Sequence, residues 1–275
     1  MAGTIDDAPL GDQTAYPQTY DPGLLFPIER AQSRTPLEIG DALPFHGEDV
    51  WNAYEVSWLG PGGLPVVRIG TFWFDAHSPH IIESKSLKLY LNSLNNTRFD
   101  SEEIAITAIR ADLSSASGAP VRVALSAVGS LVPNVTGVLP GRCIDDATTV
   151  VDTYSVEPAF LHNAAAGTPV LETVYSDLLR SCCPVTGQPD WASVVIRYRG
   201  PAIDPQALLR YIVSFRNHAD FHEHCVERIF MDIKRHCEPA ALSVWARYTR
   251  RGGLDINPFR SDAETPVANV RHARQ

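Results

Sequence analysis

The sequence has 275 residues, of which 44% are hydrophobic and 20% charged. That is the composition of a soluble globular protein, long enough for one large domain or two of ordinary size without metal or disulfide staples. The formal net charge of −9 argues against duplex nucleic acid or an anionic membrane as the main partner, although a local basic cluster can still hold one anionic ligand.

The N-terminus and the cysteines predict a cytoplasmic protein. Residues 1–7 carry Asp6 and Asp7 where a secretory signal is basic and then apolar, and no apolar run approaches the ~20 residues of a membrane span. The five cysteines are an odd number without the spacing of a disulfide framework. They are therefore expected to be reduced, either buried or reactive.

The elements follow one another in two similar halves. Residues 1–46 are rich in proline and poor in periodic apolar positions, so we expect an extended arm with short turns. The apolar patterns that follow predict, in order, strands at 50–58 and 65–74 joined by a glycine-rich hairpin loop, helices at 86–95 and 101–113 and a strand at 121–128, then a strand at 191–199, helices at 205–215 and 221–234, and a strand at 242–249.

The two halves share a pattern at a spacing of 121 residues. Leu-x-x-Tyr-x-x-Ser-x-x-Asn occurs at 87–96 and again at 208–217, and the same shift places Glu102 on Glu223. This repetition predicts an α+β protein in which one antiparallel ββααββ-like unit is duplicated. The alternative is two unrelated α+β segments that share helix composition. The expected division is an arm (1–46), a first module (47–150) and a second module (151–275).

The most unusual stretch is Ser-Cys-Cys-Pro-Val-Thr-Gly-Gln-Pro-Asp-Trp at 181–191. Its prolines and glycine predict a rigid turn that holds Cys183 seven residues before Asp190. A thiol is a good nucleophile only as the thiolate, so a nearby carboxylate that takes up its proton suits catalysis. The structural alternative is a surface turn with a buried cysteine.

A second cluster contains His218, His222, His224 and Cys225. Histidines four residues apart are compatible with zinc, but no His-Glu-x-x-His motif occurs, and Cys225 fits the core face of a helix. Two other interpretations remain, ordinary polarity at a helix start and a ligand-binding pair formed by His222 and Glu223.

Two further segments suit an anionic ligand. Residues 83–88 (Glu-Ser-Lys-Ser-Leu-Lys) place two lysines and two hydroxyls at a helix start, and residues 247–253 place three arginines before two glycines. A solvated helix entrance and a charged strand end are the alternatives. Neither the dinucleotide-binding glycine motif of a Rossmann fold nor a P-loop is present.

Together these segments resemble the NADPH-dependent 7-cyano-7-deazaguanine reductase family of queuosine biosynthesis in its long, two-module form. The matching stretches are Glu-Ser-Lys-Ser-Leu-Lys-Leu-Tyr at 83–90, Cys-Pro-Val-Thr-Gly-Gln-Pro-Asp at 183–190, Phe-His-Glu at 221–223 and Arg-Arg-Gly-Gly-Leu-Asp-Ile-Asn-Pro at 250–258. The resemblance implies tandem tunnelling-fold modules and reduction of a nitrile to a primary amine with two NADPH.

The resemblance also implies roles for individual residues. Cys183 forms a covalent thioimide with the nitrile carbon, Asp190 shuttles protons, and Cys182 receives no role because it is one place off the motif spacing. The deazaguanine base is held by Glu83, Glu223 and His222 with the backbone of Ile82 and Ser84. NADPH contacts Ser84, Lys85, Arg251 and Gly252, and no metal is implied.

The implied partners are the free base and a second copy of the chain, in a homodimer, without direct contact to nucleic acid or membrane. Two rival functions remain, a zinc-dependent cyclohydrolase of pterin type on the same fold and a non-catalytic purine-binding module. The sequence does not indicate whether sites are shared between subunits, what the arm does, or what Cys143, Cys225 and Cys237 do.

Overall fold

The computed structural model describes residues 16–128 and 137–275, which form two compact units. The first unit comprises residues up to Gln32, Asp49–Val135 and Arg250–Ile256; the second comprises Ser33–Glu48, Thr136–Thr249 and Asn257–Gln275. Both units combine helices with mainly antiparallel strands, so the predicted α+β class is confirmed. Unlike the expected modules, neither unit is continuous in sequence. Residues 33–48 fold with the second unit, and residues 250–256 fold with the first unit.

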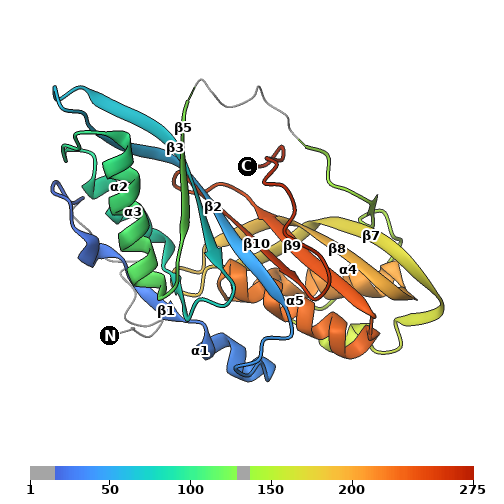
Figure 1. Ribbon diagram of the computed structural model, residues 1–275. Coiled ribbons are helices and arrows are strands. Elements are labelled where there is room, and N and C mark those ends of the chain that lie inside the picture. Colours follow the sequence, from blue (N-terminus) through green and yellow to red (C-terminus); the bar gives the residue numbers. More distant parts are fainter. Residues whose placement is uncertain (1–15, 129–136) are drawn as a thin grey trace. The chain divides into compact units, whose positions relative to one another are not determined.

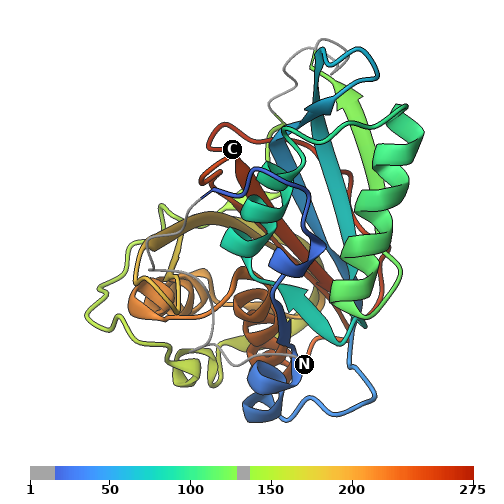
Figure 2. The same cartoon turned by 90° about the vertical axis from the view of Figure 1, so that its left-hand side faces the viewer.

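In the first unit two helices cover one face of the strands (Figures 1 and 2). The strands lie in the order β5-β3-β2, and β1 pairs with β4 in a separate two-stranded sheet. The buried core between helices and strands includes Trp51, Phe72 and Leu87. The elements are β1 (Pro27–Glu29), β2 (His46–Leu59), β3 (Pro65–Asp75), β4 (His80–Ile82), α2 (Ser84–Ser93), α3 (Glu102–Ser117) and β5 (Arg122–Ala127).

The second unit has the strand order β10-β9-β8-β7-β6, with α4 and α5 on one face (Figure 1). All of its pairings are antiparallel except the two-residue parallel pairing of β6 with β7, which the sequence did not predict. The elements are β6 (Arg142–Cys143), β7 (Ala165–Cys182), β8 (Pro189–Ile203), α4 (Pro205–Ser214), α5 (His222–Cys237), β9 (Ala241–Tyr248) and β10 (Leu254–Ser261), with short 3-10 helices at Pro158–Leu161 and Phe215–Asn217.

The predicted arm is tied to other segments through short elements. Residues 1–15 lie outside the described residues; the rest of the arm contains β1, the single-turn α1 (Ala31–Arg34) and 3-10 turns at Pro22–Leu24 and Thr35–Leu37. The Phe26 N–H donates to the Ser86 hydroxyl at 3.0 Å, and the Glu83 N–H donates to the Phe26 carbonyl at 2.9 Å. These two bonds hold the arm against the start of α2.

The predicted helices and strands are all present, with ends shifted by a few residues. Helix α2 begins two residues earlier than expected and α3 extends to Ser117, where Gly118 ends it in the left-handed conformation (φ 75°). The sequence analysis missed β7 and β10 together with the short strands β1, β4 and β6. Both missed long strands carry residues on which the site depends.

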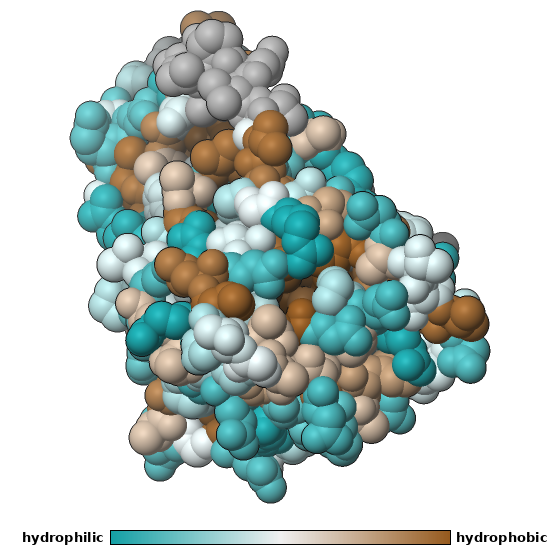
Figure 3. All heavy atoms as spheres, turned by 90° about the vertical axis from the view of Figure 1, so that its right-hand side faces the viewer, coloured by the Kyte–Doolittle hydropathy of each residue, from teal (hydrophilic) through white to brown (hydrophobic). Residues whose placement is uncertain are grey.

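The surface is mixed in polarity. Figure 3 shows one face on which teal hydrophilic side chains are interspersed with brown apolar ones. The apolar side chains with the largest exposed fractions include Leu64, Val138, Val150 and Leu171. Within the described residues, every helix is too short or too polar to cross a membrane.

Candidate functional site

The register of the β7–β8 hairpin places Cys183 and Asp190 on one face. Asp190 pairs directly with Ser181, and Cys183 follows Ser181 by two residues. Because directly paired residues share a face and side chains alternate along a strand, the Ser181, Cys183 and Asp190 side chains point to the same side. Cys183 itself lies just beyond the end of β7, so the register places it two positions along from the residue directly opposite Asp190.

The turn that joins the strands is closed around Cys183. The Cys183 N–H donates to the Gln188 carbonyl, and the Gly187 N–H donates to the Cys183 carbonyl, both at 2.9 Å. Gly187 has φ 68°, a conformation that a residue with a side chain rarely adopts. Both Cys183 and Asp190 are 6% exposed, so the candidate nucleophile and its acid lie in a largely dehydrated position.

Cys182 lies on the opposite face of the hairpin. It pairs with Pro189, and its thiol lies 3.8 Å from the Arg216 carbonyl, to which the Arg180 guanidinium also donates. This alternation gives a structural reason for leaving Cys182 out of the site.

Helix α5 brings His222 to Asp190. The His222 Nε2 atom lies 3.7 Å from the Asp190 Oδ1 atom, and the His222 ring meets the Tyr248 ring edge to face, with centroids 4.0 Å apart. Glu223, the next residue of the helix, is 2% exposed. The structure thus brings together two of the predicted catalytic and base-binding residues, Asp190 and His222, with Glu223 adjacent to His222 in the chain and Cys183 in the turn that precedes Asp190.

His218 and His224, the other histidines of this cluster, lie against the carboxylate of Asp220 rather than that of Asp190. Asp220 accepts from the His224 Nδ1 atom at 3.0 Å and lies 3.5 Å from the His218 Nε2 atom. Burial works against the charged form, but these two histidines hold the pKa of Asp220 well below its ordinary value. Among the described residues, no group of three histidine, cysteine, aspartate or glutamate side chains is arranged to hold a metal ion.

In the first unit, Glu83 caps helix α2. Its carboxylate accepts from the Lys85 N–H at 2.8 Å and from the Ser86 N–H at 2.7 Å, and its side chain is fully buried. Burial raises the pKa of Glu83, and the hydrogen bonds from the helix start oppose that rise only in part. The backbone N–H groups of Lys85 and Ser86 therefore already have a carboxylate partner. Ile82, at the end of β4, pairs with Pro27 of β1.

The side chains that remain available for an anion lie near a glycine turn. The Arg251 N–H donates to the Leu254 carbonyl at 2.8 Å, and Gly252 and Gly253 both have positive φ (59° and 81°). A Cβ on Gly252 would lie 2.8 Å from the Lys88 Nζ atom, and one on Gly253 would lie 2.6 Å from the Glu55 carboxyl carbon. Only glycine lets the Lys88 ammonium and the Glu55 carboxylate approach the turn this closely.

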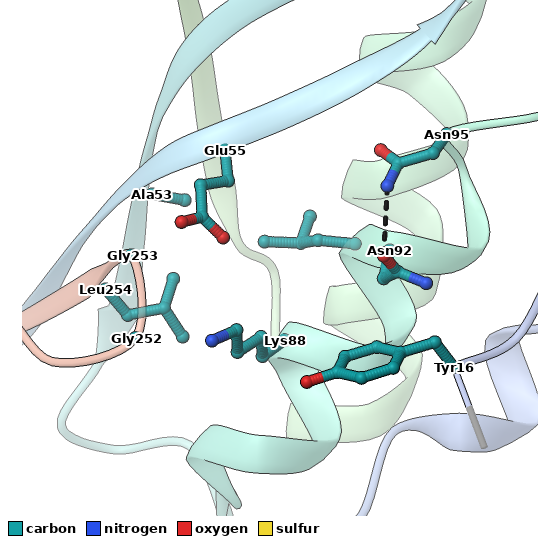
Figure 4. Close-up of a pocket in the computed structure, with 10 residues that line it drawn as sticks. Tyr16, Ala53, Glu55, Lys88, Asn92, Asn95, Gly252, Gly253 and Leu254 are labelled. Carbon is teal, nitrogen blue, oxygen red and sulfur yellow. Dashed lines mark hydrogen bonds between the residues drawn. The ribbon is translucent and has the colours of Figure 1, made fainter. Parts of the chain in front are cut away.

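A cavity of about 200 Å³ opens beside this turn (Figure 4). In the figure the Lys88 ammonium and the Glu55 carboxylate both point toward it, while Asn92 and Asn95, joined by a 3.0 Å hydrogen bond, line it from the α2 side. The cavity is lined by Tyr16, Ala53, Glu55, Lys88, Leu91, Asn92, Asn95, Gly252, Gly253 and Leu254.

The three arginines do not form the single clamp that the sequence suggested. Arg247 donates to the Ala268 carbonyl and to Asn269, whereas the Arg250 guanidinium lies over the Tyr54 ring at 4.5 Å. Arg251 is the one that begins the glycine turn, which agrees with the residue that the resemblance singled out.

Sequence reasoning missed Tyr248 and Glu55 as contributors, whereas Lys88 was included in the segment expected to suit an anionic ligand. Lys88 stands in the motif at 83–90 and is three residues from Lys85, one helical turn, so helix periodicity was a usable signal. Tyr248 and Glu55 had no such signal, because their neighbours are distant in sequence.

Comparisons with known proteins agree with the motifs. A family model described as "Nitrile reductase, 7-cyano-7-deazaguanine-reductase N-term" matches residues 16–125, and one described as "QueF-like protein" matches residues 189–266. Cys183 lies outside both matched ranges, whereas Glu83, Asp190 and Glu223 lie inside them.

Whole-length relatives carry one name. A Bordetella pertussis protein is 55% identical over 273 residues, which cover 99% of this chain and 100% of the relative, and one from Chromohalobacter salexigens is 51% identical over 277 residues (99% and 98%). Both are named NADPH-dependent 7-cyano-7-deazaguanine reductase. A solved structure, the archaeosine synthase QueF-Like in the apo form, aligns with a TM-score of 0.32 and 16% identity over 37% of this chain and 99% of that chain. With near-complete coverage at more than 50% identity, the chain belongs to the NADPH-dependent 7-cyano-7-deazaguanine reductase family.

Proposed function

We propose that this protein reduces the nitrile of 7-cyano-7-deazaguanine to the aminomethyl group with two NADPH, through a covalent thioimide on Cys183, as a step of queuosine biosynthesis. The observation that supports this proposal is the β7–β8 register, in which Asp190 pairs with Ser181, two residues before Cys183, while His222 lies 3.7 Å from Asp190. Family membership supplies the substrate and the cofactor.

The first step adds the thiol across the nitrile. The Cys183 sulfur bonds to the nitrile carbon, one carbon–nitrogen π bond breaks, and the thiol proton reaches the nitrogen by way of Asp190. A free thiol has a pKa of about 8.5 and is only a few per cent thiolate at neutral pH, so a carboxylate that accepts its proton raises the fraction that reacts.

NADPH would supply two hydrides, each delivered with one proton, to the carbon that Cys183 has activated. The thioimide would take up the first hydride and proton, and the carbon–sulfur bond would then break as one nitrogen-bound proton passes to sulfur, leaving an imine and the Cys183 thiol. The imine takes up the second hydride and proton to become the amine. Asp190 is placed to return protons to nitrogen and sulfur, and its low exposure keeps water from hydrolysing the intermediates.

Base recognition falls to acidic side chains. The guanine-type edge presents adjacent N–H donors, and a carboxylate is an acceptor-only group that suits them. In the second unit we assign this role to Glu223 with His222. In the first unit we assign it to Glu83, whose burial and fixed position as a helix cap hold the carboxylate in one orientation, together with the Ile82 and Ser84 backbone.

For the cofactor we assign Ser84, Lys85, Arg251 and Gly252. The contact between Lys88 and the Gly252 turn places a further cation beside these residues, which suits the phosphate groups of NADPH.

Intact-mass analysis tests the covalent mechanism. Incubation with 7-cyano-7-deazaguanine, without NADPH, is expected to add the mass of one base to the wild type and none to Cys183→Ala. Cys182→Ala is the matched control, because it removes the neighbouring thiol and should keep the adduct. An adduct on Cys183→Ala, or undiminished turnover by that variant, would show that the mechanism is wrong.

Stoichiometry tests the reaction class. Two NADPH oxidised for each amine formed is the expected ratio, because a nitrile needs four electrons to become an amine. Stoichiometric zinc in the purified protein would instead support the cyclohydrolase alternative. Binding of the base with no NADPH oxidation would support the non-catalytic module.

Arg251→Ala is expected to raise the KM for NADPH by about tenfold, the cost of one lost charge-assisted contact, while the KM for the nitrile changes much less. Steady-state kinetics with each substrate varied in turn measures both. Arg110→Ala, which removes an exposed arginine on α3, is the control for the loss of one positive charge. Equal rises in both KM values would remove Arg251 from the cofactor site.

We further propose a cytoplasmic homodimer. The resemblance carries this proposal, and strand edges support it, since within the described residues β5 pairs only with β3. Light scattering coupled to gel filtration is expected to give the mass of two chains; the mass of one chain would contradict it.

A further inference from the structure

The segment before helix α5 is bonded to the cysteine-bearing strand. The Cys182 N–H donates to the His218 carbonyl at 2.8 Å, and the Asp220 N–H donates to the Cys182 carbonyl at 3.1 Å. These two bonds form a short parallel bridge between Cys182 and Ala219. The backbone immediately before Cys183 is thereby fixed to residues 218–220.

The Asp220 side chain fixes the other end of the same segment. Its Oδ1 atom accepts from the Phe221 N–H at 2.8 Å and from the His224 Nδ1 atom at 3.0 Å, and its Oδ2 atom lies 3.5 Å from the His218 Nε2 atom. Phe221, the residue that precedes α5, makes no side-chain cap of its own. Asp220 therefore orients the first turn of α5, which begins with His222 and Glu223.

Asp220 thus links the segment before Cys183 to the helix start that carries His222 and Glu223, and in the proposed function both contact the same substrate. Its backbone is bonded to the strand that ends in Cys182 and Cys183, and its carboxylate is bonded to the helix start that carries His222 and Glu223. The Asp220 carboxylate accepts hydrogen bonds from the Phe221 N–H and the His224 ring, and displacing it would break both at once.

We propose that Asp220 is a positioning residue that sets the placement of His222 and Glu223 relative to the Cys183 thiol. Asp220 itself does not touch the substrate. This inference rests on the proposed function, in which Cys183 bonds to the nitrile carbon while Glu223 and His222 hold the base.

Three variants test it. Asp220→Ala removes both acceptor atoms, and Asp220→Asn keeps one oxygen that accepts from the Phe221 N–H while removing the charge. The matched control is Asp204→Ala, because Asp204 caps the start of α4 in the same unit with a 2.9 Å bond from the Gln206 N–H. Both alanine variants lose a helix-start acceptor, but the Asp204 N–H donates to the Ala164 carbonyl, whereas the Asp220 N–H donates to the Cys182 carbonyl.

The main readout is adduct formation on Cys183 without NADPH, measured over a range of base concentrations. Asp220→Ala is expected to raise the half-saturating base concentration about tenfold and to slow the rate of adduct formation at saturation. The reason is that the base-binding side chains of His222 and Glu223 are displaced relative to the Cys183 thiol. Asp220→Asn is expected to recover part of both losses, and Asp204→Ala to change neither. Wild-type values in a folded Asp220→Ala, or equal losses in Asp204→Ala, would overturn the proposal.

Amide hydrogen exchange separates this proposal from the proposed function. Asp220→Ala is expected to speed exchange at the Cys182 amide, whereas Asp204→Ala leaves it unchanged. If the wild type forms no adduct and oxidises no NADPH with the base, the proposed function fails, yet the exchange result still tests the link. Unchanged Cys182 exchange in Asp220→Ala would overturn the link whatever the activity.

Discussion

Tyr248 supports the imidazole that faces Asp190. Its ring is 1% exposed and meets His222 edge to face, and it lies at the end of β9 opposite Ala192, two residues beyond Asp190. Within the described residues its hydroxyl makes no conventional hydrogen bond, and its polar neighbours are the buried Ser181 hydroxyl and the Cys225 thiol. The ring, more than the hydroxyl, holds His222 in place.

Substitutions of Tyr248 are expected to separate the contribution of its ring from that of its hydroxyl. Tyr248→Phe should keep kcat/KM within about twofold, and its melting temperature should stay equal or rise, because an unsatisfied buried hydroxyl stabilises little. Tyr248→Leu should lower kcat/KM by about tenfold, since an aromatic pair contributes roughly 1 kcal/mol and fixes ring orientation. A large loss in Tyr248→Phe would instead assign a role to the hydroxyl.

At the residue scale, the sequence predicted the chemistry better than the contacts. The spacing of Cys183 and Asp190 predicted a thiol and its acid, which stays a prediction, and the β-hairpin register pairs Asp190 with the residue two places before Cys183. The partner of His222 could not be predicted, because Asp190 and Tyr248 reach it through strand pairing between distant segments. The histidine pair that suggested zinc is divided between two aspartates, Asp190 and Asp220.

Helix α2 begins with an unusual cap. Serine, threonine, aspartate and asparagine are the usual residues at the capping position. We expected the helix to begin at Ser86. In the structure it begins at Ser84, and the residue that caps it is Glu83. The carboxylate is buried, and burial raises its pKa above the ordinary glutamate value. An acid whose pKa is raised by folding binds its proton more tightly in the native than in the unfolded state.

The raised pKa of Glu83 determines the direction in which the free energy of unfolding changes with pH. As pH rises from about 4.5 toward the folded pKa of Glu83, the unfolded state loses its proton first, so the free energy of unfolding falls through this window. Glu83→Gln lacks this contribution. Its melting temperature relative to wild type, measured by thermal unfolding, should therefore increase between about pH 4.5 and about pH 7.5, a range that begins near the ordinary glutamate pKa. Glu55→Gln removes an exposed carboxylate of the same unit and should show no such trend; a constant difference for Glu83→Gln would contradict the argument.

Among the elements, periodic helices were predicted and irregular strands were not. In α2 and α4 the repeated leucine, tyrosine and serine are all buried, and the Ser93 and Ser214 hydroxyls each donate to the carbonyl three residues earlier at 2.6 Å. Strand β10 was missed because Asp255, Asn257 and Pro258 resemble a loop. Asp255 is nevertheless buried, since it accepts from Asn52 and Tyr54 of β2, and that pairing is invisible in local sequence.

Across the molecule, the five cysteines differ sharply in accessibility. Cys183, Cys225 and Cys237 are buried, whereas Cys143 and Cys182 are partly exposed. Burial raises the pKa of Cys237 to about 11, and burial together with the Asp220 charge raises that of Cys225 well above its ordinary value. Cys225 and Cys237 therefore stay protonated thiols at neutral pH.

Alkylation of the native protein is expected to follow this order. Iodoacetamide at about pH 8, near the ordinary thiol pKa, should label Cys143 and Cys182 first and leave Cys225 and Cys237 unlabelled until denaturant is added. Peptide mass mapping measures the labelling at each cysteine, with the denatured protein as the control. Equal native and denatured labelling of Cys225 would show that its surroundings open readily.

The division of the chain between the two units has a consequence for protein engineering. Residues 250–256, with the Arg251–Gly253 turn and Asp255, fold with the first unit although nearly the whole second unit precedes them, and residues 33–48 fold with the second unit although the first has barely begun. A gene cut near the middle would encode two fragments, each missing a strand segment that the other carries. Chimaeras that exchange one half of the chain for that of a homologue therefore have to exchange residues 33–48 and 250–256 accordingly. Otherwise the recombined protein combines the Arg251–Gly253 turn of one parent with helix α2 of the other.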